Sequence, residues 1–182
     1  MSRLKTKFMN TVMKNPVVVA SGTYGYGEEY VDYYDPVLLG GVCSKGITRY
    51  PKPGNDGIRL WETPSGLLNS IGLENPGIEV FIGKHLKKMN SLNTAVIVNI
   101  GGNTIDEYLE SVELLNGCNI DFIELNISCP NVKVGGMAFG IKAESAAEVV
   151  SKVRKISKHK IMVKLSPNAE NIIEMAKACE DS

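Results

Sequence analysis

The sequence lacks an excess of charge of either sign. Its 182 residues contain 20 Lys and Arg against 20 Asp and Glu, so the formal net charge at pH 7 is zero. Nucleic-acid-binding domains are usually strongly basic, and proteins held on anionic membranes carry clusters of Lys and Arg. The charge balance therefore argues against a nucleic-acid partner and against an electrostatic membrane anchor.

Long apolar runs are also missing. No stretch approaches the roughly 20 apolar residues that a membrane-spanning helix requires. The beginning of the chain has some features of a signal peptide, but Asn10, Lys14, Asn15 and Pro16 interrupt it, and Val17–Ala20 is too short for the apolar region of such a peptide. We expect a soluble, cytoplasmic protein.

Cysteine is scarce and widely spaced. The four cysteines, at positions 43, 118, 129 and 179, include no C-x-x-C pair. Their spacing fits neither a zinc site nor a dense disulfide framework, so we expect reduced thiols and no bound metal. The sequence also lacks a G-x-G-x-x-G pattern after its first predicted strand, which argues against a dinucleotide-binding sheet.

Short β-branched runs alternate along the chain with helical patterns. These runs are apolar at successive positions, as is typical of parallel strands that are covered on both faces. The predicted strands are Pro16–Ala20, Val42–Lys45, Ala95–Ile100, Asp121–Asn126 and Lys160–Leu165.

Helix-start signals lie between these strands. Residues 78–89 form one amphipathic stretch, and three others are marked by side chains that commonly cap a first helical turn. The expected caps are Thr104 with Glu107, Ser145 with Glu148, and Asn168. By contrast, residues 48–77 show no clear periodicity, and a loop this long in a compact domain is usually functional. We expect Trp61, which lies in it, to be a core residue.

The alternation predicts an α/β fold with a parallel sheet, either a doubly wound sheet or a (β/α)8 TIM barrel. A barrel closes with eight strands in roughly 200 residues or more, and five strands are visible here. If the fold is a barrel, the chain covers about the first five βα units, and we expect it to be the N-terminal portion of a longer protein.

Polar residues occur at or just beyond the carboxyl end of every predicted strand. They are Ser21, Lys45, Asn99, Asn126 and Lys164. In a barrel these positions face one mouth, where active sites are built. A single such residue would mean little, because loops commonly begin with polar residues, but the recurrence at all five strands indicates a site.

Two segments near this mouth carry chemistry. Asn126–Asn131 (NISCPN) places Cys129 in a loop stiffened by proline; such a thiol can act as a general base, or it can be a buried thiol in a turn. Asn69–Gly77 (NSIGLENPG) contains Gly72, which permits close backbone approach, and amides that can recognise a planar polar ligand. The alternative for this second segment is a plain Gly/Asn/Pro turn.

Together these segments resemble the class 1 dihydroorotate dehydrogenases, which are FMN-containing barrels of pyrimidine biosynthesis. The resemblance covers the whole chain. It is carried by Ala20–Thr23, Cys43–Thr48, Asn69–Gly77, Val98–Ile100, Glu124–Asn131 and Met162–Pro167. Position 129 holds cysteine, as in class 1, where the membrane-bound class 2 enzymes have serine. The sequences of Asn69–Gly77 and Val132–Gly140 resemble those of the 1B subgroup.

The resemblance implies a single FMN-binding barrel domain over residues 1–182, truncated at its C-terminus. In the family reaction, Cys129 would take the proton from C5 of dihydroorotate while a hydride leaves C6 for FMN, giving orotate. The implied flavin-binding residues are Ser21, Lys45, Gly46, Asn99, Asn126 and Lys164. The implied substrate-binding residues are Lys45, Asn69, Ser70, Ile71, Gly72, Leu73, Asn126 and Asn131.

The resemblance also implies a partner. Catalytic subunits of the 1B subgroup pair with a subunit that carries FAD and a 2Fe–2S cluster and passes electrons to NAD⁺, so we expect a homodimer of catalytic subunits within a heterotetramer. The family's FMN phosphate site lies on three further strands. We therefore expect the 182-residue chain by itself to bind FMN poorly.

Three other interpretations remain open. An FMN barrel similar to that of dihydropyrimidine dehydrogenase would act on uracil or thymine. A tRNA-modifying flavin barrel is a more distant alternative, against which the neutral charge argues. A half-barrel without catalytic activity, acting as a binding module, would hold no flavin.

Overall fold

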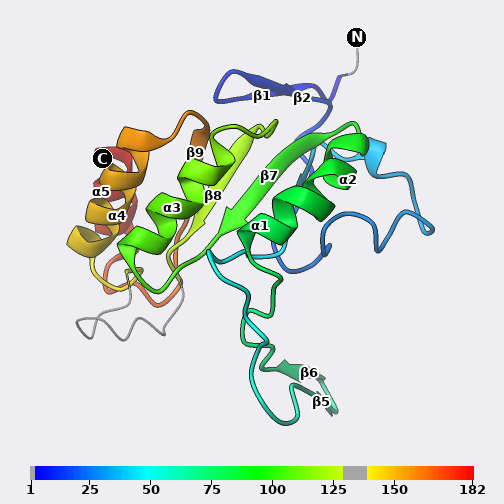
Figure 1. Ribbon diagram of the computed structural model, residues 1–182, viewed down its shortest axis with the longest axis horizontal. Helices are drawn as coiled ribbons and strands as arrows, with labels where there is room; N and C mark the ends of the chain where they lie inside the picture. Colours follow the sequence, from blue (N-terminus) through cyan, green and yellow to red (C-terminus); the bar gives the residue numbers. More distant parts are fainter. Residues whose placement is uncertain (1–2, 129–138) are drawn as a thin grey trace.

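The computed structural model describes residues 3–128 and 139–182. A sheet of five parallel strands forms its centre (Figure 1). In spatial order these are β3 (Val18–Val19), β4 (Gly41–Cys43), β7 (Ala95–Ile100), β8 (Phe122–Asn126) and β9 (Lys160–Lys164). The spatial order is the chain order. A doubly wound sheet would reverse its order at a switch point, so the arrangement is that of a partial TIM barrel, as predicted.

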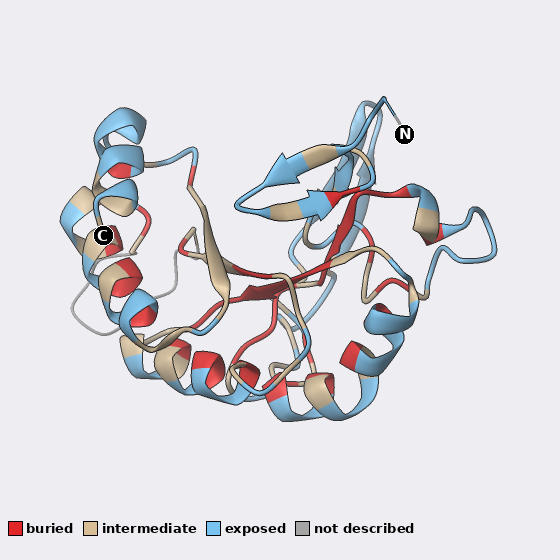
Figure 2. Cartoon of the chain, turned by 90° about the horizontal axis from the view of Figure 1, so that it is seen from above, coloured by how far each residue is buried: buried red, intermediate tan, exposed pale blue. Residues whose placement is uncertain are grey.

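The helical segments lie along one side of the curved sheet (Figure 2). They are η1, a 3-10 turn (Pro36–Leu38), α1 (Ile78–Val80), a π-helical turn (Phe81–His85), α2 (Leu86–Ser91), α3 (Ile105–Leu115), α4 (Ala143–Ile156) and α5 (Ile172–Glu180). The first βα unit is thus reduced to a 3-10 turn in place of a full helix. No helix within the described ranges is long and apolar enough to cross a lipid bilayer.

Two apolar layers lie on opposite faces of the sheet. On the outer face, Val98, Ile100, Ile123 and Leu125 pack in one cluster with buried residues of α3 and α4. On the inner face, a smaller cluster surrounds Ile97 and groups it with three other buried residues. These are Met13, Cys43 and Phe122. Because side chains alternate along each strand, the outer packing fixes which residues face inward.

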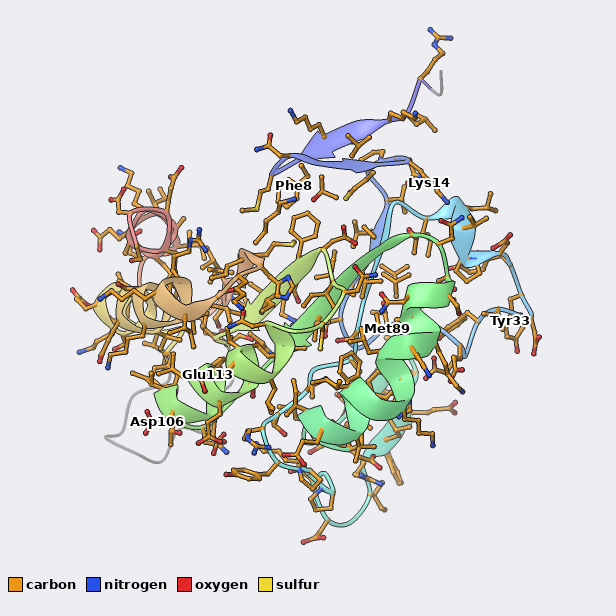
Figure 3. The ribbon with its side chains drawn as sticks, turned by 45° about the horizontal axis from the view of Figure 1, so that its top comes forward. Phe8, Lys14, Tyr33, Met89, Asp106 and Glu113 are labelled. Carbon is orange, nitrogen blue, oxygen red and sulfur yellow. The ribbon has the colours of Figure 1, made fainter. Side chains whose placement is uncertain are left out.

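An antiparallel hairpin covers the inner apolar cluster, and it was not predicted from the sequence. Its strands are β1 (Thr6–Phe8) and β2 (Thr11–Met13). The ring of Phe8 extends from the hairpin toward the sheet (Figure 3), and its centroid lies 5.5 Å from that of Phe122. The Lys160 ammonium also donates a hydrogen bond to the Thr11 hydroxyl. The hairpin therefore covers the inner face near the amino ends of β8 and β9.

Residues 48–77 contain a second unpredicted hairpin, β5 (Leu60–Thr63) and β6 (Gly66–Asn69). It extends away from the sheet (Figure 1). The expectation that Trp61 is a core residue is wrong, because this side chain lies on the hairpin and is 61% exposed. The predicted loop is thus partly regular structure whose apolar residues do not join the core.

One buried amide holds this long excursion against the body of the barrel. The side-chain oxygen of Asn75 accepts hydrogen bonds from the backbone N–H groups of Thr48, at 3.1 Å, and Gly77, at 2.9 Å. Its side-chain nitrogen donates to the carbonyl of Leu73 at 2.7 Å. Asn75 therefore ties the segment after β4 to the segment before α1, and so fixes both ends of the excursion.

The predicted cap of α3 is confirmed. The Thr104 hydroxyl accepts a hydrogen bond from the backbone N–H of Glu107, at 3.2 Å. The Glu107 carboxylate accepts from the N–H of Asn103, at 2.7 Å, and not from that of Thr104, so the two bonds are not the reciprocal pair of a capping box.

The other two predicted caps are wrong. Helix α4 begins at Ala143, which places Ser145 inside its first turn. Helix α5 is capped by Asn171 and not by Asn168: the Asn171 side-chain oxygen accepts from the N–H groups of Ile173, at 3.1 Å, and Glu174, at 3.3 Å. The N-cap residue of α4 is Lys142, which makes no side-chain cap hydrogen bond. Before α5, two asparagines offer the same capping chemistry, and the one directly before the helix is used.

The cap of α5 gives a direct test with a matched control. Asn171→Ala should lower the free energy of unfolding by about 1 kcal/mol, because two N–H groups at the start of the helix lose their acceptor. Asn168→Ala, which removes the same side chain from an exposed position outside the helix, should change it by less than about 0.5 kcal/mol. Urea unfolding of both variants measures the difference. A larger effect at position 168 would contradict the assigned cap.

The role of Asn75 can be tested in the same way. Asn75→Ala should reduce the free energy of unfolding by about 2 kcal/mol, since it leaves buried backbone donors without an acceptor. The control is Asn55→Ala, because Asn55 is an exposed asparagine of the same excursion whose side chain hydrogen-bonds, among the described residues, to Ser70 alone. Its loss should be less than about 1 kcal/mol. Equal losses in the two variants would show that Asn75 does not have this special role.

Candidate active site

A cavity of about 610 Å³ lies at the carboxyl ends of the strands. It gathers most of the residues that the sequence predicted for a site. Those lining it are Ser21, Lys45, Gly46, Asn69, Ile71, Gly72, Leu73, Asn126 and Lys164. These residues come from the loops after β3 and β4, the end of β6 and the segment after it, and the ends of β8 and β9. The volume is within the range of small-molecule sites.

The segment after β4 reaches the cavity because β7 guides it. The predicted strand through Lys45 ends at Cys43, but the next residues remain hydrogen-bonded beside β7. The Ser44 N–H donates to the Ile97 carbonyl, and the Ile47 N–H donates to that of Asn99, each at 2.9 Å. Lys45 and Gly46 thus lie at the mouth of the sheet while their backbone is held on both sides.

The second predicted segment turns sharply at the cavity. Gly72 and Leu73 have φ angles of +75° and +57°, a region in which side chains are strained. A Cβ atom at Gly72 would lie 2.4 Å from the side-chain oxygen of Asn55, so only glycine fits. The close approach to the backbone that Gly72 permits is therefore made, within the described residues, by Asn55. The neighbouring Glu74 is paired with Arg59 at 2.9 Å, which anchors the same turn.

Asn99 does not line the cavity but lies directly beneath it, fully buried. Its side-chain nitrogen donates to Oε1 of Glu124 at 2.6 Å. Its side-chain oxygen is buried and has no hydrogen-bond partner among the described residues. A Cβ atom at Gly46, on the cavity wall, would lie 3.0 Å from that oxygen. An unpaired acceptor therefore lies immediately behind a wall residue that has no side chain.

Asn126 is held from two sides at the end of β8. Its backbone carbonyl accepts a hydrogen bond from the Tyr108 hydroxyl of α3, at 2.7 Å. Its side-chain oxygen accepts from the hydroxyl of Ser128 at 2.5 Å and from the Ser128 N–H at 3.3 Å. With the oxygen so occupied, the amide nitrogen of Asn126 is the group suited to donate to a ligand in the cavity.

The charges around the cavity are mixed. Lys45 and Lys164 line it, together with Glu29 and Glu74. Lys164 lies 3.5 Å from the Glu124 carboxylate, while Lys45 makes no ion pair with any described residue. Lysine ammonium groups and amides near one another suit a planar, polar ligand that carries negative charge.

Besides Asn99, three of the predicted site residues are not placed in the cavity lining. Ser70 lies outside the cavity lining, with its hydroxyl accepting from the Asn55 amide at 2.9 Å. The predicted contact of Ser70 with substrate stays a prediction. Cys129 and Asn131 lie outside the described residues, so their predicted roles stay predictions.

Sequence reasoning missed two residues with titratable side chains in the loop after β3. Tyr26 and Glu29 line the cavity. The Glu29 carboxylate accepts from the Tyr26 N–H at 3.1 Å. Burial, and then the negative charge of Glu29, raise the pKa of Tyr26 to about 12, so its phenol is neutral at physiological pH. The run of glycine and aromatic residues from Gly22 to Tyr30 was the available signal for this part of the wall.

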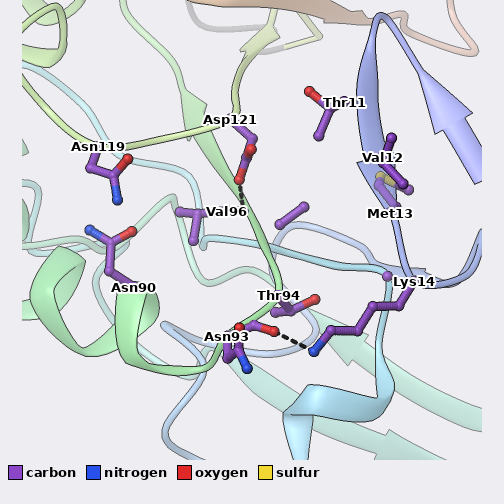
Figure 4. A pocket seen from close by; sticks show the side chains of 12 residues that line it. Thr11, Val12, Met13, Lys14, Asn90, Asn93, Thr94, Val96, Asn119 and Asp121 are labelled. Carbon is purple, nitrogen blue, oxygen red and sulfur yellow. Dashed lines mark hydrogen bonds between the residues drawn. The ribbon is translucent and has the colours of Figure 1, made fainter.

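A second cavity, of about 320 Å³, lies at the opposite, amino-terminal end of the strands (Figure 4). Its charged groups already serve the fold. The Lys14 ammonium donates to the Asn93 carbonyl at 2.6 Å, and the Asp121 carboxylate accepts from the Val96 N–H at 2.9 Å. None of the predicted site residues lines it, so the larger cavity is the candidate active site.

Comparison with known proteins shows the family of the chain. A family model described as dihydroorotate dehydrogenase matches residues 3–182. The chain is similar to proteins named "Dihydroorotate dehydrogenase B (NAD(+)), catalytic subunit" from three bacteria. The identity is 53% for Petrotoga mobilis, covering 98% of this chain and 59% of the relative. It is 52% for Brachyspira hyodysenteriae and 46% for Bacteroides thetaiotaomicron, each covering 100% of this chain and 60% of the relative.

The chain therefore spans about 60% of the length of these relatives. The match runs through every strand of the sheet and every described wall of the cavity. On this coverage, the chain belongs to the dihydroorotate dehydrogenase family.

Proposed function

We propose that this chain supplies the first part of an FMN-dependent dihydroorotate dehydrogenase, which oxidises dihydroorotate to orotate in pyrimidine biosynthesis. The observation that carries the proposal is the cavity itself. Residues 21, 45, 46, 69, 126 and 164, which are far apart in sequence, form one polar wall at the carboxyl ends of parallel strands. That is the end of a barrel at which catalytic residues are found.

The residues present fit a flavin ring. Gly46 leaves the wall flat where a side chain would project, and the unpaired oxygen of Asn99 behind it is an acceptor suited to a ring N–H donor. Ser21, Asn126 and Lys164 supply further polar groups, and the positive charge of Lys45 and Lys164 favours a ring that becomes anionic on reduction. When bound, FMN supplies the ring nitrogen that accepts a hydride.

The substrate side of the cavity is assigned to the segment after β6. Asn69 and the turn Ile71–Leu73 offer an amide and backbone groups that match the carboxylate and ureide edges of dihydroorotate, and Lys45 supplies a positive charge. Asn126 is held ready to donate from its side-chain nitrogen. Asn131 is proposed to assist. Ser70 is proposed to hold this segment in place through its hydrogen bonds with Asn55 and Arg59. These groups orient the substrate, and orientation supplies much of the catalysis.

Cys129 is the proposed base. In the sequence it follows Ser128, three residues after Asn126, which lines the cavity. Its thiolate would take the proton from C5 of dihydroorotate as the hydride leaves C6, which forms the double bond of orotate. A thiol suits this work because its ordinary pKa, about 8.5, is close enough to neutral for a base that neighbours help to deprotonate.

The electrons are proposed to leave through a partner. The relatives are named catalytic subunits of an NAD(+)-linked enzyme, a name that implies another subunit. We assign FAD and a 2Fe–2S cluster to that subunit, with NAD⁺ as final acceptor, and a pair of catalytic subunits to the assembly.

The first test is the visible absorption spectrum, recorded without oxygen, of the protein in its native length. We expect flavin absorption that bleaches when dihydroorotate is added, because the substrate reduces the bound cofactor. Flavin that bleaches only with a reductant and reoxidises with uracil or thymine would indicate a dihydropyrimidine dehydrogenase. A native-length protein that binds no flavin would support the non-catalytic binding module and overturn the proposal.

The role of Cys129 has its own test. Cys129→Ser should reduce the rate of flavin reduction by dihydroorotate at neutral pH by about a hundredfold or more, since a serine hydroxyl is a far weaker acid than a thiol. The rate should recover in part at high pH. Stopped-flow absorbance measures the rate. The control is Cys118→Ser, because Cys118 is a half-buried thiol in the turn that follows α3. Near-normal reduction by the Cys129 variant at neutral pH would remove the thiol from the mechanism.

A further inference from the structure

Three groups converge on a single carboxylate oxygen beneath the cavity. Oε1 of Glu124 accepts from the side-chain nitrogen of Asn99 at 2.6 Å and from the thiol of Cys43 at 3.5 Å. The Lys164 ammonium lies 3.5 Å from the same oxygen. The Glu124 side chain is only 14% exposed. A carboxylate this deep in the sheet requires such partners, because burying it alone would be strongly unfavourable.

The sheet register makes this convergence a fixed property of the fold. Asn99 lies opposite Glu124 in the pairing of β7 with β8, and both face inward. Cys43 is paired with Ile97, the preceding inward position of β7, and Lys164 is paired with Asn126, the following inward position of β8. The four groups thus occupy neighbouring inner-face positions on four adjacent strands.

Glu124 decides which way the amide of Asn99 points. Only the nitrogen of that amide can donate to a carboxylate. The hydrogen bond at 2.6 Å therefore fixes the nitrogen toward Glu124. The oxygen is left without a partner, beside Gly46 on the cavity wall. If the residue at 124 did not require a donor, the amide could turn over and present the wrong group.

Glu124 also restrains a charge. Lys164 lines the cavity and has no other ion pair among the described residues. The ion pair with Glu124 therefore holds its ammonium near the base of the cavity. The third group, Cys43, adds no charge, because burial and the nearby Glu124 carboxylate raise the pKa of its thiol and keep it neutral.

We propose that Glu124 is a positioning residue of the flavin site: its carboxylate orients the Asn99 amide so that an acceptor faces the ring, and it holds Lys164 at the edge of the cavity. This inference rests on the proposed function, since it assigns to Glu124 the arrangement of Lys164, which lines the proposed flavin site, and of Asn99, which lies directly beneath it. Glu124 itself lies outside the cavity lining.

The test is Glu124→Gln in the native-length protein, which keeps the shape of the side chain and removes its charge. The affinity for FMN should fall about tenfold or more, because a charge-assisted hydrogen bond and the tether on Lys164 are both lost. The midpoint potential of bound FMN should become more positive, because a negative charge beneath the ring no longer opposes its reduction. Fluorescence titration and dye-linked reduction measure the two quantities.

The matched control is Glu148→Gln, which also removes one carboxylate, from an exposed i,i+4 pair with Lys152 on α4. It should alter neither quantity. A general loss of packing in the Glu124 variant would weaken FMN binding without raising the potential. Unchanged potential in Glu124→Gln, with wild type reduced normally by dihydroorotate, would overturn the positioning role and leave the proposed function standing. Wild type that binds no flavin would overturn both.

A second measurement applies if Glu124→Gln does not fold. In wild-type protein labelled with ¹⁵N, the two Asn99 side-chain N–H protons should differ strongly in chemical shift, since one of them is bonded to a carboxylate. The exposed Asn55 amide, which bonds only to neutral oxygens of Ser70, provides the comparison within the same spectrum. A separation for Asn99 no larger than that for Asn55 would overturn the proposed orientation.

Discussion

The site depends on the packing of the outer face of the sheet. Val98 and Ile100 on β7, with Ile123 and Leu125 on β8, are fully buried against the helices. A slip of one residue in either strand would turn these side chains inward and place Asn99 and Glu124 among apolar helix residues, at a cost of several buried side chains. Hydrophobic burial on one face thus fixes the positions of polar groups on the other, with no need for those groups to stabilise the fold themselves.

The inner face then divides along the strand direction. Toward the amino ends, Ile97 and Phe122 form an apolar cluster that the β1–β2 hairpin covers. One inward position further along, at Asn99 and Glu124, the side chains are polar and hydrogen-bonded to each other. The apolar layer keeps water from the base of the sheet, and an electrostatic interaction above it is stronger for that reason. The cavity lies above both layers.

Much of this could be predicted from the sequence. The five parallel strands, their order of appearance and the cluster of polar residues at their carboxyl ends follow from side-chain patterns that act locally. The two hairpins could not be predicted in this way, because their strands are three or four residues long and carry little periodicity. Trp61 was misplaced because hydrophobicity favours burial, whereas the excursion that carries it leaves the core. Asn168 failed as a cap because Asn171, nearby, offers the same chemistry.

The five polar strand-end residues looked equivalent in the sequence, and depth is what separates them. Lys45 and Asn126 lie at the cavity wall, whereas Asn99 stops one layer lower, fully buried beneath Gly46. An amide at that depth must have both of its ends accounted for, because an unpaired buried polar group costs about 1–3 kcal/mol. Glu124 satisfies the nitrogen. The side-chain oxygen remains unpaired and destabilises the empty site. Under the proposed function, a bound ring that donates a hydrogen bond to this oxygen would remove that destabilisation. Fold and site are joined at this one amide: the sheet places it, the carboxylate orients it, and its oxygen is left unpaired behind the cavity wall.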